Sequence, residues 1–187
     1  MLEKMREIDE ARKAQKEQQA LLESEEQARK IKQEREDEQF VSEVIKKLDP
    51  QSLLEKINRE VLQGRGGISV PGKTKCIDGE TGKQIFVFDL NWDSGRVESP
   101  GSGYTDFGES ISIIVGASIC REITYKGPYR TIHQYKGVKV KGGDKPVANF
   151  ELNRVEDIKS LSPEIEKALV KAFESSHWSN FRSTEIG

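Results

Sequence analysis

The sequence predicts an α+β protein: a long charged N-terminal helix, which is a candidate for a weak coiled coil, a second amphipathic helix, and then a mainly antiparallel β-sheet domain covered by C-terminal helices. All 16 glycines lie at or after Gly64, and every aromatic residue lies at or after Phe40. The first 39 residues carry 21 charges. About six apolar segments of strand length follow, separated by turn residues, and helical spacing returns near the end. Consecutive strands followed by helices favour an antiparallel sheet.

We divide the chain into a helical arm (1–48), an amphipathic helix (49–63) and a β-rich domain (64–187). The arm is rich in Glu, Lys, Arg, Gln and Ala, which favour helix. Acid-to-base pairs such as Glu26 and Lys30 lie four residues apart and support that helix. Its apolar residues hold no regular heptad. A helix packed on a partner or a second copy, a solvated single helix and a disordered tail all remain open.

An amphipathic pattern begins at Phe40 and restarts after Asp49-Pro50, where Asp49 suits the cap and Pro50 the first helical position. Gly64 is expected to end this second helix. The two apolar stripes must be covered, either by the following domain or by other subunits. The residues of this candidate partner-binding face are Phe40, Val41, Val44, Ile45, Leu48, Leu53, Leu54, Ile57 and Val61.

The β-rich domain is expected to start with a hairpin whose strands are Thr74–Ile77 and Gln84–Leu90. Residues 91–109 are polar and contain four glycines, and we interpret them as a long loop. Further strands are predicted at 110–119, 121–125, 129–135, 138–141 and 146–152. A final helix is expected to open at Ser162-Pro163, with Asn153 as a candidate cap in the segment before it, and an aromatic tail is expected to dock after it.

A basic stretch with tyrosines suggests a nucleic-acid-binding surface. Residues 121–145 carry a net charge of +5, so the rest of the chain carries −7. Lysines and arginines bind phosphates, and tyrosine rings stack on bases. A protein partner with an acidic surface and an ordinary solvated sheet face are the alternatives. The candidate residues are Arg121, Lys126, Tyr129, Arg130, Tyr135, Lys136, Lys139 and Lys141.

Residues 67–74, GISVPGKT, match the phosphate-loop pattern, and Asp89 follows an apolar run as a magnesium-binding Asp would. A phosphate loop requires a strand before it and a helix after it. Here a helix precedes the pattern and a hairpin follows it, so we rank nucleotide binding as the least favoured function.

No catalytic constellation is assembled by spacing. His133 and His177 are isolated, and Cys76 and Cys120 lack metal-site or disulfide spacing. The acids Asp89, Asp93, Asp106 and Glu109 do not reproduce a calcium loop. We therefore expect no enzyme, no metal and no cofactor.

No apolar run approaches the roughly 20 residues that span a bilayer, and the charged N-terminus resembles neither a secretory signal nor a transit peptide. We expect a cytoplasmic protein, or one of a host cytoplasm or virion. The leading hypothesis is a structural protein that assembles with protein subunits, as a homo-oligomer or in a larger particle. Nucleic-acid binding through 121–145 is the alternative.

Overall fold

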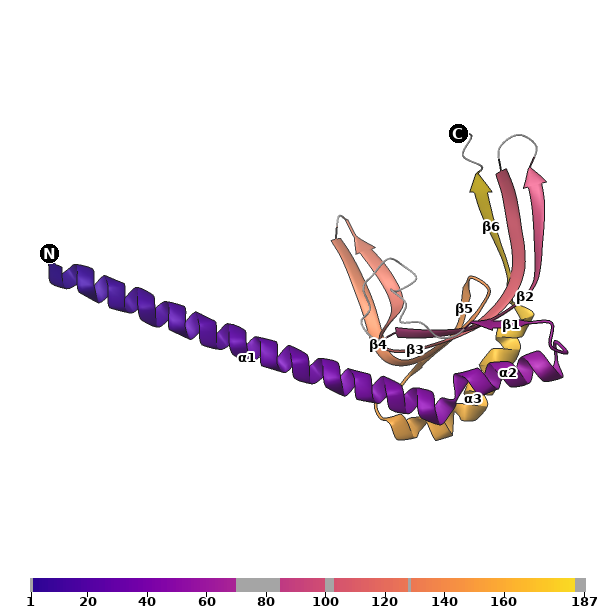
Figure 1. Cartoon of the computed structure of the whole chain (residues 1–187), viewed down its shortest axis with the longest axis horizontal. Coiled ribbons are helices and arrows are strands. Elements are labelled where there is room, and N and C mark those ends of the chain that lie inside the picture. Colours follow the sequence, from indigo (N-terminus) through magenta and orange to yellow (C-terminus); the bar gives the residue numbers. More distant parts are fainter. Residues whose placement is uncertain (1, 70–84, 100–102, 128, 184–187) are drawn as a thin grey trace. The chain divides into compact units, whose positions relative to one another are not determined.

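The computed structural model describes residues 2–69, 85–99, 103–127 and 129–183. It confirms the predicted α+β class (Figure 1). The chain forms two compact units, Met1–Gln39 and Phe40–Gly187. This division falls before the boundary that we drew at Leu48, because Val41, Val44 and Leu48 belong to the core of the second unit.

The first unit is made of one helix, α1, which runs from Leu2 to Leu48 and continues into the second unit. Surface pairs four residues apart support it, as the sequence indicated. The Lys30 ammonium lies 2.6 Å from the Glu26 carboxylate, and the Gln19 amide donates to Glu23 over 3.0 Å. These exposed pairs contribute only a few tenths of a kcal/mol each, about 0.2–0.5. The helix therefore depends mainly on the intrinsic preferences of its residues.

The chain turns between α1 and α2 (Pro50–Glu60) as the sequence predicted. Asp49 adopts a left-handed backbone conformation with φ 47°, and its side chain accepts a hydrogen bond from the Ser52 amide at 3.3 Å. Pro50 occupies the start of the helix. Regular α-helix ends at Glu60, before the expected Gln63, and a turn leads to Gly64 with φ 80°. Only glycine adopts this conformation without strain.

In the part of the chain that the structure describes, six antiparallel strands form one sheet, in the order β1-β2-β3-β4-β5 with β6 also paired to β3 (Figure 1). The strands are β1 (Gly67–Ser69), β2 (Ile85–Ser99), β3 (Gly103–Lys126), β4 (Tyr129–Gly142), β5 (Lys145–Glu151) and β6 (His177–Ser183). On one side of β3, the neighbouring strand changes along its length: β3 pairs with β6 up to Glu109 and with β4 from Ile111. Ser110 marks this change of neighbour: its amide donates to the Ser176 carbonyl, and its carbonyl accepts from the Gly143 amide, both over 2.9 Å.

The predicted polar loop at 91–109 is wrong. Residues 91–99 continue β2, and residues 103–109 begin β3, with Val97 opposite Thr105. A register shift between Trp92 and Gly95 accommodates Asp93, which has φ 49°. Polar residues and glycines do not prevent strand formation here, because antiparallel pairing satisfies the backbone and such strands do not need a buried face on both sides.

Other strand boundaries also differ from those that the sequence predicted. β3 and β4 are each continuous where the sequence predicted two strands, with register shifts at 116–119 and 120–122. The aromatic tail forms a strand on its own domain, where β6 pairs with β3. The first strand of the predicted hairpin, Thr74–Ile77, lies outside the described residues, whereas β2 starts within the expected Gln84–Leu90 segment.

A single C-terminal α-helix, α3 (Ile158–Glu174), follows the short helix η1 (Val155–Asp157), where the sequence predicted helices. The expected start at Ser162-Pro163 is wrong, and Pro163 lies inside α3. Pro163 has no amide to donate to the carbonyl of Lys159, and this residue is exposed. The Asn153 cap is also wrong: Asp157 accepts from the Arg154 amide over 3.0 Å. Burial of Ile158 extends the helix beyond the start that local signals indicate.

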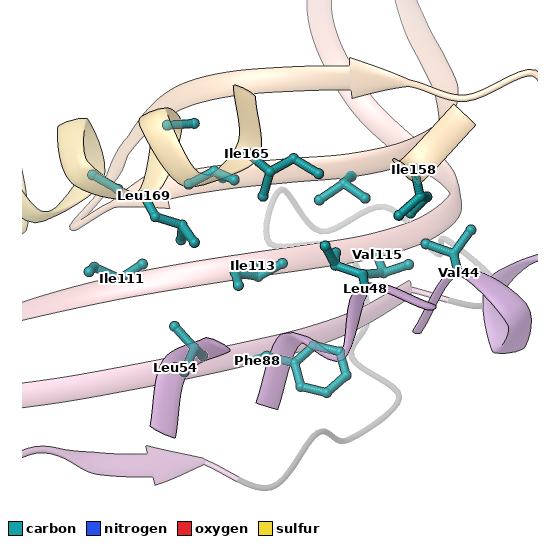
Figure 2. Packing of buried hydrophobic residues seen from close by; sticks show 14 of the residues in the cluster. Val44, Leu48, Leu54, Phe88, Ile111, Ile113, Val115, Ile158, Ile165 and Leu169 are labelled. Atoms are coloured by element: carbon teal, nitrogen blue, oxygen red, sulfur yellow. The ribbon is translucent and has the colours of Figure 1, made fainter. Parts of the chain in front are cut away.

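The end of α1, α2 and α3 pack on one face of the sheet (Figure 2). Leu48, Leu54 and Ile165 point toward the strand residues Phe88 and Ile113 in this core. Each fully buried aliphatic side chain contributes about 1.5–3 kcal/mol relative to exposure. The helices and the sheet therefore hold one another in place.

Gly142 permits a close approach between β4 and α3. A Cβ atom built on Gly142 would overlap the backbone carbonyl of Ala172. Ala172 is fully buried in the core. The absence of a side chain at position 142 thus sets how closely the C-terminal half of α3 lies on the sheet.

Candidate functional site

A groove between α2 and α3 is the candidate functional site. It has a volume of about 360 Å³ and is mainly apolar. It is lined by Leu53, Lys56, Ile57 and Glu60 of α2, by Val61 directly after this helix, and by Glu166, Leu169, Val170 and Phe173 of α3. Both helices are held from below by the sheet, so the groove belongs to the rigid core of the second unit.

The floor of the groove rests on an aromatic pair. The ring of Phe173 stacks on that of Trp92 in β2, with centroids 5.4 Å apart and planes inclined by 13°. Trp92 and Leu169 are buried, whereas Leu53 and Ile57 are half-buried and pack against the same core. The parts of these side chains that face the core stabilise the domain, and the parts that face solvent form the groove.

The upper walls leave apolar surface in contact with solvent. Val170 is 61% exposed, Val61 51% and Phe173 36%. The charged residues at the rim are Lys56, Glu60 and Glu166. A concave apolar surface with a charged rim is typical of a protein-binding site, because burial of the apolar centre supplies affinity and the rim supplies orientation.

The structure places most of the predicted partner-binding face inside the protein. Val41, Val44, Leu48 and Leu54 are buried in the core of their own domain, which corrects the expectation that they contact other subunits. Phe40, Ile45, Leu53 and Ile57 are half-buried against the same core. Leu53, Ile57 and Val61 do line the groove.

Sequence reasoning missed the α3 wall of the groove. Helical spacing predicts that Leu169 and Phe173 lie on the core-facing side of the C-terminal helix. The available signal was Val170, an apolar residue off that side, whose 61% exposure is now explained by its position at the groove.

The described side chains of the basic stretch do not form one surface. Val138 and Val140 face the helices, so Lys139 and Lys141 lie on the opposite face of the sheet. Lys136 instead lies 5.8 Å from the ring centroid of Phe40, which packs on the helix side. The described lysines are thus divided between the two faces of the sheet.

Other members of this set are engaged within the domain. Lys139 donates to the Cys120 carbonyl over 3.1 Å, and Arg121 lies 4.0 Å from the Glu151 carboxylate. Tyr135 is buried and donates to the Asn149 side chain over 3.0 Å, so its ring is not presented to a base. Burial raises the pKa of Tyr135 above its ordinary value of 10.0. Lys126, Tyr129 and Arg130 lie in the β3–β4 hairpin, and their side chains fall outside those described.

The phosphate-loop pattern begins in a strand. Gly67, Ile68 and Ser69 form β1, which pairs antiparallel with β2 after helix α2. The remainder of the pattern lies outside the described residues. Asp89 is opposite Ser69 in this pairing. The described part therefore has strand geometry where a phosphate loop would begin to wrap the ligand.

The described residues contain no group of three or more His, Cys, Asp or Glu side chains that could hold a metal ion. His133 and His177 are exposed, and Cys120 is buried. Of the four acids noted above, Asp89 and Glu109 are half-buried, Asp93 is exposed, and the side chain of Asp106 is not described. Within the described ranges, no helix combines the length and apolarity required to cross a membrane.

Comparisons with protein-family models, with curated proteins and with solved structures find no match to this chain.

Proposed function

We propose that this chain is a non-enzymatic assembly protein that contacts other protein subunits through the α2–α3 groove and its helical arm. The observation that carries the proposal is the apolar groove, in which Val61, Val170 and Phe173 expose their side chains. Transfer of these side chains from water into an interface releases about 25 cal/mol per Å² of apolar area. A rigid groove loses little conformational freedom on binding, which favours association.

The arm supports the same function. Of its described side chains, Leu21 is 61% exposed and Leu22 59%. A helix of this length extends about 70 Å at 1.5 Å per residue. The part of this helix in the first unit, up to Gln39, offers a long contact surface to another subunit, and it lies before Val41, where the buried core begins.

The test is the mass of the full chain in solution over a range of concentrations. We expect self-association, and we expect Val170→Glu to shift the protein toward monomer, because a carboxylate in the groove would have to be desolvated. Lys167→Gln changes the net charge by the same amount at an exposed position of α3 outside the groove lining, and we expect it to leave the mass unchanged. A wild-type monomer at all concentrations, or an unaffected Val170→Glu variant, contradicts the proposal.

A further inference from the structure

The β3–β4 hairpin extends beyond the rest of the sheet as a two-stranded ribbon. Among the described residues, β2 pairs with β3 as far as Gly116, and β5 pairs with β4 as far as Gly137. These two glycines pair with each other, and beyond them the described residues of β3 and β4 pair only across their own hairpin. We call the described residues of 119–135 the β3–β4 ribbon. It leaves the sheet on the side away from α2 and α3 (Figure 1).

The base of the ribbon is fixed to the domain. It belongs to a small apolar cluster, separate from the main core, that is formed by Ile85, Ile114, Ile119 and Tyr135. The Tyr135 hydroxyl also donates to the Asn149 side chain over 3.0 Å. Two register shifts lie near this base, and such bulges bend a pair of antiparallel strands. The ribbon is therefore anchored where it departs from the sheet.

The tip of the ribbon lies in open space. Gly127 has φ 61° in the turn, and a Cβ atom built on it would meet nothing within 4 Å. Thr131, His133 and Gln134, on the returning strand, are exposed. A two-stranded hairpin by itself is marginally stable in water, so this extension adds little to the stability of the domain. Its position favours a role in contact with a partner.

The ribbon is the basic part of an acidic chain. Its charged residues are Arg121, Lys126 and Arg130 against Glu122, a net charge of +2. From 123 to 143 the chain contains five basic residues and no acidic one. Residues 119–142 together carry six basic residues and one acidic, or +5, so the rest of the chain carries −7. A local excess of positive charge attracts a polyanion.

Basic residues and tyrosines are paired at the tip. The register places Lys126 opposite Tyr129 and Arg130 opposite Tyr125. Because neighbouring residues of a strand belong to opposite faces, these two pairs belong to opposite faces of the ribbon. Lysine and arginine bind phosphates, and tyrosine also contacts the sugar-phosphate backbone. A ribbon with a cation on each face suits a groove that has a phosphate backbone on each side.

We infer that the β3–β4 ribbon binds double-stranded DNA by entering a groove, with Lys126 and Arg130 as the phosphate-binding residues. The major groove of B-form DNA is about 12 Å wide and admits a two-stranded β-ribbon, whereas that of A-form RNA is too narrow. Contacts to phosphates carry no sequence information, so binding is independent of base sequence. The inference goes beyond the proposed assembly function and uses a different surface.

The experiment measures the affinity of the full-length chain for a mixed-sequence DNA duplex by fluorescence anisotropy. We expect binding at about 50 mM salt that weakens steeply as salt is added. Replacing both cations, Lys126→Gln with Arg130→Gln, is expected to weaken binding at least about tenfold and to lower the salt slope by about two. The matched control is Lys159→Gln with Lys167→Gln, which removes two charges from exposed positions of α3. We expect it to stay within about threefold of the wild type.

Two further measurements separate the ribbon contact from misfolding and from general attraction. Arg130→Lys keeps the charge and is expected to bind within about threefold of the wild type, and thermal unfolding checks that every variant is folded. A photo-reactive side chain introduced at the exposed Thr131 is expected to cross-link to the duplex, whereas one at Lys159 is not.

The outcomes distinguish this inference from the proposed function. Absence of duplex binding by the wild type at low salt overturns the inference, and so does an equal loss in the two double variants. Equal affinity for double-stranded RNA, or for an acidic polypeptide such as polyglutamate, overturns the assignment to a DNA groove. The assembly proposal is judged by the mass in solution and by Val170→Glu, so it stands or fails separately.

Discussion

Trp92 of β2 and Phe173 of α3 stack in parallel, with their ring centroids 5.4 Å apart. One face of the Phe173 ring thus lies on the sheet, while 36% of the residue remains exposed in the groove. The same side chain joins the C-terminal end of α3 to the sheet and contributes to the candidate interaction surface. Mutations at Phe173 and at its neighbours in the groove can therefore separate effects on stability from effects on the proposed function.

Phe173→Ala is expected to destabilise the domain by about 2 kcal/mol, because it removes the stacking contact and part of a large apolar side chain. Urea unfolding of dilute protein measures the change. Val170→Ala truncates a more exposed side chain in the same groove and is expected to change the free energy of unfolding by less than about 0.5 kcal/mol. Equal effects of the two substitutions would contradict a stabilising role for the Trp92 contact.

Gly142→Ala is expected to destabilise the domain by about 1–3 kcal/mol, because the added methyl group overlaps the Ala172 carbonyl and α3 must move from the sheet. Gly67→Ala in β1 is the matched control, since a Cβ atom there meets nothing within 4 Å. Thermal unfolding of both variants measures the difference. A Gly142→Ala variant as stable as Gly67→Ala would show that α3 does not approach β4 this closely.

The ion pair between Lys47 of α1 and Glu156 of η1 predicts a pH dependence. The Glu156 backbone amide, and then the Lys47 ammonium at 3.1 Å, hold the pKa of this carboxyl below its ordinary value of 4.5. A lowered pKa in the folded state adds stability above the unfolded pKa, and this contribution is lost as the pH falls through the folded value. We expect Glu156→Gln to lower the urea midpoint slightly at neutral pH and to have no effect once the carboxyl is protonated.

Glu164→Gln is the control for this prediction, because it removes a carboxylate from exposed α3 surface and leaves the Lys47 contact in place. Added salt is expected to reduce the effect of Glu156→Gln, since both partners are at the surface. An effect of Glu156→Gln that persists in acid would contradict an electrostatic origin.

Tyr135 predicts a loss of stability in alkali. Burial raises its pKa above the ordinary 10.0. A group whose pKa is raised on folding contributes stability that is fully present below the unfolded value, here about pH 10, and lost as the pH rises through the folded value. The tyrosinate absorbance of the wild type should therefore contain a component that ionises late. Tyr135→Phe should lack this component.

The same variant tests the hydrogen bond to Asn149. Because the substitution leaves the Asn149 side chain without the Tyr135 hydroxyl, we expect a cost of about 1 kcal/mol at neutral pH. If Tyr135→Phe instead loses a component that ionises near the ordinary tyrosine pKa, Tyr135 is accessible to hydroxide, in conflict with its burial.

Short-range sequence signals, such as helix capping and helix propensity, predicted the elements that short-range interactions stabilise. Asp49 and Pro50 start α2 because a carboxylate caps the free amides and proline fits the first turn. The arm is helical because its residues favour helix at every position. In contrast, the strands at 91–99 and 103–109 have polar composition, and they form because β2 and β3 satisfy one another's backbone groups across the hairpin.

The candidate site likewise combines features that local sequence predicts with features that only the fold creates. The apolar character of Leu53, Ile57 and Val61 was readable from helical spacing, but their neighbours in α3 lie more than a hundred residues later in the chain. Spacing identifies which side of a helix is apolar. It does not identify which part of that side the domain covers, because coverage depends on how two helices cross the sheet.

By itself, the sequence determined the α+β class, the helical character of the charged arm, and the helix restart at Asp49-Pro50. These follow from composition, propensity and capping, which act over a few residues. The tertiary structure alone decided that Val41, Val44 and Leu48 are core and that Val61 and Val170 are surface. Burial is a property of packing between distant segments, and only the folded sheet and its helices bring those segments together.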